Sequence, residues 1–234
     1  MKNTKNIAIL AAVVMLCGTW TACGKAKNDK SMNNSSAEEA TEQATEAAPK
    51  PVAAQSGQAY LLFRDSQDWI SYDGTDSSML AYSAEVVTID GNGQYTVSLT
   101  ADTPEFRYSV TGKEDGIYTP SGCSVTAVVI KDGATACPNA VITIDSVTLD
   151  GEKKELTAKS YTTTVDGSLH CNVYNAAAKS PADDARSAEG ALYKDNNPAT
   201  PALSDVDAYA PKIVEPITFS SWTTMEVTFT VSGM

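Results

Sequence analysis

Histidine is almost missing from this chain of 234 residues, in which His170 is the single example. The sequence also lacks the Gly-x-Ser-x-Gly, His-Glu-x-x-His, P-loop and dinucleotide-binding motifs that mark several large enzyme classes. A pair of carboxylates could cleave a glycosidic bond, but nothing singles out two of the 29 acidic residues. We therefore predict that the protein is not an enzyme and needs no cofactor.

Basic residues are also few: 17 lysines and arginines stand against 29 acidic residues, for a net charge of −12. Removal of residues 1–22, which contain Lys2, Lys5 and no acid, would leave 15 basic and 29 acidic residues, a charge of −14. Such a domain repels phosphate backbones and offers no basic patch to anionic lipids. We expect no nucleic-acid partner, and we attribute the acidity to solubility.

The N-terminus has the pattern of an export signal. Lys2 and Lys5 precede an apolar run of about ten residues, 7–16, which is too short to span a bilayer. The sequence Thr-Ala-Cys-Gly that ends at position 24 resembles the lipobox of bacterial lipoproteins. The resemblance implies cleavage after residue 22 and acylation of Cys23.

Lipid attachment would decide where the protein works. Two acyl chains hold a protein stably at a membrane, and the diacylglyceryl group of a lipoprotein cysteine supplies two. We therefore expect Cys23 to anchor an exported protein to the outer face of the cell membrane, at the cell surface. Trp20 departs from the aliphatic residue usual in the lipobox. A plain secretory signal cut nearby and a membrane-spanning anchor remain the alternatives.

Residues 23–58 have almost no large apolar side chain, and they end in a stretch that contains Pro49 and Pro51. Such a composition cannot bury enough surface to offset the entropy of ordering the chain. We predict a disordered acidic linker that holds the domain away from the membrane.

Residues 59–234 fit one domain, and their hydrophobic pattern has a period of two. Apolar residues alternate with polar ones over 94–101 and 225–231, which predicts strands with one buried face. The more continuously apolar run 124–130 suits a central strand. Over 140–149 the alternation changes phase at Asp145 and Ser146, which predicts a β-bulge there.

Six Asp-Gly pairs, several of them between the expected strands, suit tight hairpin turns. Helical periodicity is nearly absent. The fold class that follows is all-β: an antiparallel β-sandwich. The long segment 176–211 does not fit the pattern; we expect no strand in it and one short helix that begins near Ser180 and Pro181 and stops at Gly190.

Three cysteines remain once Cys23 is assigned to the anchor. Cys123 and Cys137 flank an expected hairpin, so a disulfide between them is possible in an exported protein. A zinc site is disfavoured because His170 and Cys171 are adjacent in a strand and would point to opposite faces. Small, buried, apolar thiols are the commoner outcome.

Four aspartates, at positions 65, 68, 73 and 76, cluster in one expected loop. Carboxylates suit Ca²⁺, but their spacing matches no EF-hand. A structural calcium ion is therefore the weaker interpretation, and a solvated acidic loop is the stronger one.

Aromatic side chains in turn-rich segments are candidates for sugar binding. Trp69 and Tyr72 lie in a polar connection, where an aromatic either plugs the end of the sandwich or forms an exposed platform. Tyr174 and Asn175 close a strand at the start of the long segment, and strand ends often carry sites. Asn175 could bind a hydroxyl group or simply terminate the strand. Trp222, just before the last strand, is expected in the core.

Several segments, in order, resemble the galactose-binding-like jelly-roll modules of surface carbohydrate-binding proteins in Gram-positive bacteria. They are AYLLFRDSQDW, DGNGQYTVSLT, PNAVITIDSVTLDGEKKEL, NVYN and WTTMEVTFTV, and together they span most of 59–233. The resemblance implies a jelly roll that binds glycans without catalysis, with Trp69 at the matching aromatic position. Cys137 stands where an aromatic is expected, and the segment 176–211 is unusual.

Two functions remain in competition. The first is binding of a glycan or cell-surface polysaccharide by a surface lipoprotein, through Trp69, Tyr72, Tyr174 and Asn175. The second is a structural or adhesive envelope protein that binds protein partners, because one fold can serve many functions. A solute-binding lipoprotein of a transporter is disfavoured, since such proteins are usually larger and two-lobed.

Overall fold

The computed structural model describes residues 52–66, 71–75, 82–101 and 119–234. The predicted signal peptide, the acylation site Cys23, most of the predicted linker and the candidate Trp69 lie outside these residues. Within the described ranges, no helix has the length and apolar character that crossing a membrane requires.

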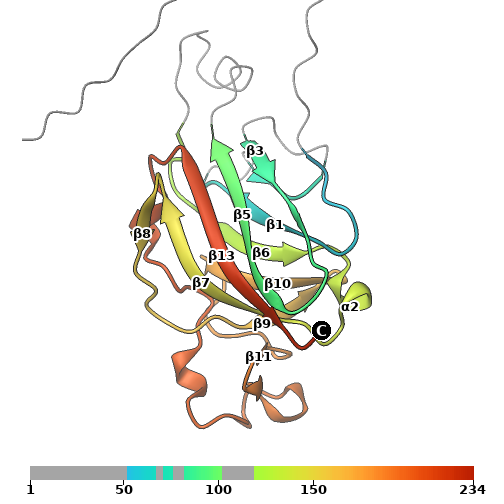
Figure 1. The fold of residues 1–234 in the computed structure, drawn as a ribbon. Coiled ribbons are helices and arrows are strands. Elements are labelled where there is room, and N and C mark those ends of the chain that lie inside the picture. The colour runs from blue at the N-terminus through green and yellow to red at the C-terminus, as the bar shows by residue number, and fades with distance from the viewer. Residues whose placement is uncertain (1–51, 67–70, 76–81, 102–118) are drawn as a thin grey trace, which may run out of the picture. The chain divides into compact units, whose positions relative to one another are not determined.

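Two antiparallel sheets form the layers of the domain, which confirms the predicted all-β sandwich (Figure 1). The larger sheet, in order across it, consists of β12 (Gly190–Ala191), β11 (Arg186–Ser187), β9 (Thr162–Val165), β10 (Ser168–Asn175), β6 (Val125–Ile130), β1 (Gln58–Arg64) and β2 (Ser71–Tyr72), with β4 (Val87–Thr88) also paired to β1. The smaller sheet consists of β3 (Tyr82–Glu85), β5 (Gly93–Ala101), β13 (Thr224–Ser232), β7 (Val141–Leu149) and β8 (Glu152–Lys154). Short helical turns are α2 (Gly133–Ala136), η1 (Lys194–Asn196), η2 (Val206–Ala208) and η3 (Pro216–Phe219).

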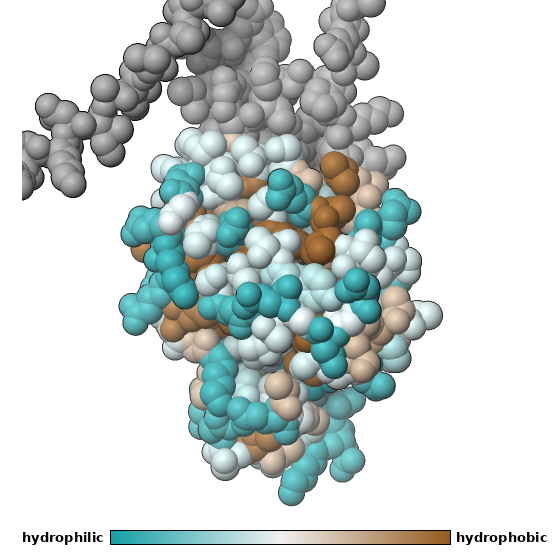
Figure 2. Space-filling model, viewed as in Figure 1, coloured by the Kyte–Doolittle hydropathy of each residue, from teal (hydrophilic) through white to brown (hydrophobic). Residues whose placement is uncertain are grey.

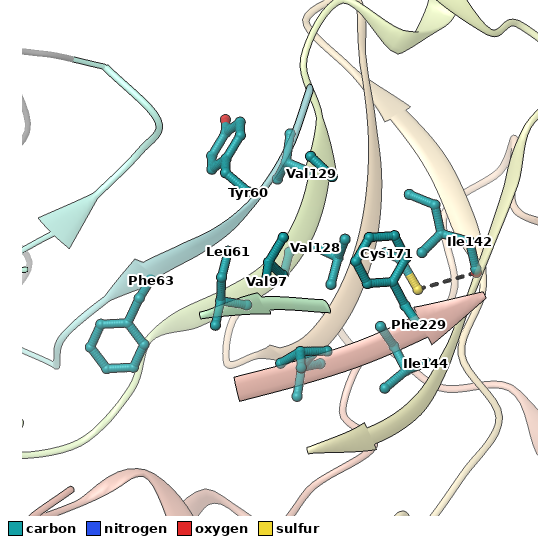
Figure 3. Close-up of a cluster of buried hydrophobic side chains, with 14 of the residues drawn as sticks. Tyr60, Leu61, Phe63, Val97, Val128, Val129, Ile142, Ile144, Cys171 and Phe229 are labelled. Carbon is teal, nitrogen blue, oxygen red and sulfur yellow. Dashed lines mark hydrogen bonds between the residues drawn. The ribbon is translucent and has the colours of Figure 1, made fainter. Parts of the chain in front are cut away.

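On β5 and β13 every second residue is apolar, and the apolar faces of the two sheets meet in the core. Along β13 the apolar residues Met225, Val227 and Phe229 are fully buried, whereas Glu226 between them is exposed. Leu61 of β1 faces them from the other sheet in the same core (Figure 3). Burial of one such side chain contributes about 1.5–3 kcal/mol, so the stripes account for the stability of the sandwich.

The outer face of the smaller sheet is turned to the viewer in Figure 2. Much of the surface in this view is pale, and the strands of this sheet pair small polar residues such as Thr96, Thr228 and Ser146. The two threonine hydroxyls lie 3.2 Å apart. This solvent-facing surface carries the polar residues that alternate with the apolar ones in the sequence.

The predicted bulge is present. Thr228 of β13 pairs with Ser146, but the next residue, Phe229, pairs with Ile144, so that Asp145 is the extra residue. The carboxylate of Asp145 accepts hydrogen bonds from Thr230 Oγ1 at 2.7 Å and from Gln94 Nε2 at 3.0 Å. The bulge keeps the apolar residues on both sides of it directed into the core.

Two of the Asp-Gly pairs form the tight turns expected of them. Asp150 (φ 52°) and Gly151 (φ 79°) join β7 to β8, and Asp166 (φ 48°) and Gly167 (φ 80°) join β9 to β10. Both residues of each pair adopt positive φ, as the type I′ hairpin turn requires.

The packed structure begins before the predicted boundary at residue 59. Ala54 is 1% exposed, and its N–H donates to the carbonyl of Gly74 at 2.9 Å. The hydroxyl of Tyr72 donates to the carbonyl of Val52 at 2.5 Å. The chain therefore joins the sandwich beside β2, at one edge of the larger sheet.

The segment 176–211 differs from its prediction. It forms no helix from Ser180 to Gly190; instead β11 and β12 pair as a short hairpin at the opposite edge of the larger sheet. Tertiary contacts order this stretch in another form, because Asp184 accepts hydrogen bonds from Thr163 and Thr164, and Ala185 is buried. Its small second core consists of Tyr161, Ala185, Leu192, Tyr193 and Tyr209.

Candidate functional site

Tyr72 does not form an exposed platform. Its side chain is fully buried, and its ring packs edge-on against Tyr60 with 6.0 Å between the centroids. Burial, and then the nearby Asp73 carboxylate, raise the pKa of the Tyr72 hydroxyl to about 12. Of the two alternatives for this residue, the structure shows the plug.

Tyr174 is also a core residue, 8% exposed, with its ring 5.6 Å from that of Phe219. The ammonium of Lys212 lies 5.9 Å from the centre of the Tyr174 ring. Asn175 terminates the strand, because its Oδ1 accepts the N–H groups of Ala177 at 3.1 Å and Ala178 at 3.2 Å. These contacts leave neither residue arranged as a sugar-binding group.

The register explains why the predicted site does not assemble. Tyr72 pairs with Phe63, Phe63 with Thr126, and Thr126 with Tyr174, so the two tyrosines lie in one row with two strands between them. Adjacent strands are about 4.8 Å apart, which places the two tyrosine Cα atoms roughly 14 Å from each other. The prediction that Tyr72 and Tyr174 bind a sugar is therefore corrected, because both rings are buried. Trp69 lies outside the described residues, and its role stays a prediction.

Exposed aromatic rings are scarce in the described part of the protein. All the tyrosine, tryptophan and phenylalanine rings whose side chains are described are buried, apart from the half-buried Tyr95. Trp222 is 1% exposed, as predicted for a core residue. Tyr95 stacks on Phe229, and its hydroxyl lies 2.8 Å from Asp90 Oδ1. A ligand site within these ranges must rely on polar groups more than on ring faces.

Cys137 and Cys171 are buried thiols, and Cys123 is half-buried. Cys123, Cys137 and Cys171 are all free, so the disulfide considered between the first two does not form. Burial raises the pKa of each thiol, that of Cys171 to about 12. Cys171 Sγ donates to the carbonyl of Ile142 at 3.4 Å across the core (Figure 3). High thiol pKa values make these cysteines poor nucleophiles.

The acidic loop has local partners in its described portion. Asp65 accepts the N–H and Oγ of Ser121 at 2.9 and 2.7 Å, and Asp73 accepts the N–H and Oγ1 of Thr75 at 3.1 and 2.7 Å. Asp68 and the fourth aspartate, at position 76, lie outside the described residues. Residues 52–66, 71–75, 82–101 and 119–234 contain no group of three or more His, Cys, Asp or Glu suited to a metal ion. The calcium interpretation stays a prediction.

His170 lies on β10, opposite Val129 on one side and Thr163 on the other. Burial lowers its pKa, and the nearby Asp166 opposes part of that change. The side chain is therefore the neutral imidazole at neutral pH.

A cavity of about 340 Å³ opens where segment 176–211 meets the sandwich; we call it the Lys159 cavity. Ser160 Oγ accepts the N–H of Ile144 at 3.0 Å, and Thr162 Oγ1 accepts that of Ile142 at 2.7 Å, which fixes this stretch to the free edge of β7. Lys159, which immediately precedes Ser160, contacts the long segment. The cavity is lined by Thr143, Ile144, Ala158, Lys159, Ser160, Ser187, Ala188, Glu189 and Tyr209.

Lys159 holds three parts of the segment together. Its ammonium lies 2.5 Å from Asp205 Oδ2, 3.1 Å from Glu189 Oε1 and 5.2 Å from the centre of the Tyr209 ring. Its backbone N–H donates to Ala208 O at 2.8 Å. The hydrogen bonds to Asp205 and then Glu189 raise the pKa of Lys159, and the bond to Lys159 lowers the pKa of Asp205.

A second hollow, the Pro211 groove, has a volume of about 400 Å³ and shares Tyr209 with the Lys159 cavity. Burial, and then the nearby carboxylates of Asp183 and Asp207, raise the pKa of Tyr193, which lines the groove. The groove is lined by Lys179, Ser180, Pro181, Tyr193, Pro198, Pro201, Val206, Asp207, Tyr209, Ala210 and Pro211.

These two hollows combine hydroxyl, carboxylate and ammonium groups with small apolar surfaces, a mixture that fits a polar, hydroxylated small ligand. Sequence reasoning missed them because Lys159 and Asp205 are 46 residues apart and no periodicity connects them. One signal was present: four prolines in the long segment, at 181, 198, 201 and 211, restrict the unfolded chain and favour a defined structure.

Comparison with known protein families, with curated proteins and with solved structures gives no match.

Proposed function

We propose that this chain is an exported, lipid-anchored protein that binds a glycan without converting it, at the hollows beside Tyr209. The observation that carries the proposal is the Lys159 cavity, where Ser187, Glu189 and Lys159 surround a small space next to an aromatic residue. A sugar presents hydroxyl groups to such polar side chains and C–H surface to the apolar ones. The volume of the Lys159 cavity is near the lower limit of about 300 Å³ for small-ligand pockets, which suits one sugar unit.

The place of the cavity in the sheet supports display at a surface. The chain joins the sandwich beside β2, at one end of the strand order, whereas the cavity lies by β11 at the other end. A tether attached through Val52 would leave the cavity on the edge remote from the attachment. Acylation of Cys23 is the part of this proposal that rests on the sequence.

The charges in the cavity favour binding over hydrolysis. A glycosidase needs one carboxyl group whose pKa is raised, so that it can donate a proton to the leaving group. Asp205 has the opposite environment, because the Lys159 ammonium lowers its pKa. Glu189 is held by the same ammonium at 3.1 Å. Both carboxylates are therefore suited to accept hydrogen bonds.

Affinity electrophoresis through gels that contain soluble polysaccharides tests the proposal, with the mature chain carrying Cys23→Ser to prevent acylation. Ala188 is exposed and lines the cavity, so Ala188→Trp should fill the space and abolish retention. Ala191 is exposed on the same hairpin but does not line the cavity, so Ala191→Trp is the matched control.

Retention by no polysaccharide would contradict glycan binding, and equal retention of the Ala188→Trp variant would contradict this location. If crosslinking on intact cells instead recovers a stoichiometric protein partner, the adhesive envelope function would replace the proposal.

A further inference from the structure

The two hollows adjoin each other. Tyr209 lines both, and the backbone on its two sides is fixed to Lys159, since Lys159 N donates to Ala208 O at 2.8 Å and Ala210 N donates to Lys159 O at 3.1 Å. The stretch 208–210 therefore borders both hollows, because Tyr209 lines the cavity, and Tyr209 and Ala210 line the groove. A ligand that fills both spaces must extend from one to the other past Tyr209.

The hollows also share a charge balance. Lys159 and Glu189 line the Lys159 cavity, and the Lys159 ammonium also contacts Asp205, which is not part of the lining. In the Pro211 groove, Lys179 and Asp207 are the charged residues that line the space. The lining of each hollow therefore has one carboxylate and one ammonium, and Asp205 adds a second carboxylate beside Lys159, on a chain whose net charge is −12.

An excess of carboxylates repels uronates, sulfates and phosphates, and it attracts hydroxyl and ammonium donors. We infer that the Lys159 cavity and the Pro211 groove are two subsites of one site, which binds a linear glycan without acidic groups, at least two sugar units long. This inference rests on the proposed function and adds the length and charge class of the ligand.

The length of the ligand can be tested by calorimetry on the mature Cys23→Ser chain, with oligosaccharides of one to four units from whichever polysaccharide retains it. Two linked subsites predict that the tetrasaccharide binds at least roughly tenfold more tightly than the monosaccharide, because the second contact becomes intramolecular. Glu189→Gln and Asp207→Asn each remove a carboxylate from one subsite, and each should lower tetrasaccharide affinity about tenfold.

Asp195→Asn makes the same charge change in the same segment, on an exposed residue that lines neither hollow, and should leave the affinity unchanged. Circular dichroism of the three variants should match the parent protein, so that loss of affinity reports the site. An effect of only one of the two site variants, or equal binding of mono- and tetrasaccharide, would overturn the two-subsite inference while glycan binding stands.

The charge class is tested by gels with a neutral glucan, chitosan and polygalacturonate. We expect retention by the glucan or by chitosan, and none by polygalacturonate in 0.15 M NaCl. Retention by polygalacturonate alone would overturn the inferred ligand class and leave glycan binding in place. Retention by none of the three and by no other polysaccharide would overturn the proposed function with it.

Discussion

The sandwich and the segment 176–211 are ordered by different means. In the sandwich, apolar stripes from the two sheets bury each other in one continuous core. In the segment, a few tyrosines, Ala185 and Leu192 form a small second core, and polar contacts attach it to the sandwich. Asp184 accepts hydrogen bonds from Thr163 Oγ1 and from the N–H of Thr164, and Arg186 Nη2 donates to the carbonyl of Ala140 at 3.1 Å.

The difference indicates that the sandwich core supplies most of the stability, whereas the segment forms the hollows. The stability of a large apolar core changes little when single polar residues at the surface change. The sandwich can therefore support a segment such as 176–211 without depending on it. A small core with charged anchors leaves hollows, one against the sandwich and one within the segment, because few side chains are available to fill them. The predictions below test whether the two regions respond separately, beginning with the largest effect.

The largest loss of stability is expected when an aromatic ring is removed from the core of the sandwich. Phe229 is fully buried in β13, and Phe229→Ala should lower the free energy of unfolding by about 3–5 kcal/mol. The measurement is denaturant unfolding followed by circular dichroism. Thr228, its neighbour on the wet face, provides the control: Thr228→Ala should change the free energy by about 0.5 kcal/mol or less. A similar loss in both variants would contradict the assignment of faces.

Much of the sandwich was predictable because the alternation of apolar and polar residues in each strand indicates which of its faces is buried. The alternation along 94–101 and 225–231 gave the faces of β5 and β13, and a single change of phase gave the bulge at Asp145. The turn at Asp150 and Gly151 followed from two residue types that tolerate positive φ. These signals are local, so one sequence suffices to interpret them.

The site was not predictable by the same reasoning. The direction of an aromatic ring near a strand end depends on the register of other strands, and Tyr72 and Tyr174 both proved to be buried. The contacts that build the hollows join Lys159 to residues 30 and 46 positions away, in a stretch without periodicity. A non-local ion cluster leaves no pattern in the sequence, so its members are known only once the chain is folded.

Removal of an apolar side chain from the second core should loosen only the segment. Leu192 is fully buried, its N–H donates to Ala185 O, and its carbonyl accepts from Ala202. Leu192→Ala should cost about 2 kcal/mol, the lower end for such a change, because a small cluster at an edge can relax. Hydrogen exchange should become faster in 176–211 and stay slow in β5 and β13.

The exposed neighbour Ala191 supplies a control in Ala191→Ser, which should leave the exchange rates as they are. If Leu192→Ala accelerated exchange in the central strands by the same factor, the segment and the sandwich would form one cooperative unit. The comparison drawn above would then be wrong.

The smallest effect is expected from the ion cluster. Lys159→Met keeps the apolar stem and removes the ammonium that faces Asp205 and Glu189. Since these side chains are about half exposed, the opening equilibrium of the segment should change by only about two- to fivefold, read as hydrogen exchange in 186–191 and 205–210. The global unfolding midpoint should not change.

The dependence on pH sharpens this test. The pKa of Lys159 is raised in the folded protein, so its contribution is complete below its ordinary value of 10.5 and is lost as the pH rises through the folded pKa. The pKa of Asp205 is lowered, so its contribution is complete above its ordinary value of 3.8 and is lost as the pH falls through the folded pKa. Protection of the segment should therefore be flat from about pH 5 to 10, fall on both sides in the parent protein, and lose the alkaline step in Lys159→Met. An alkaline step that persists in the variant would show that another group, and not Lys159, holds the segment to the sandwich.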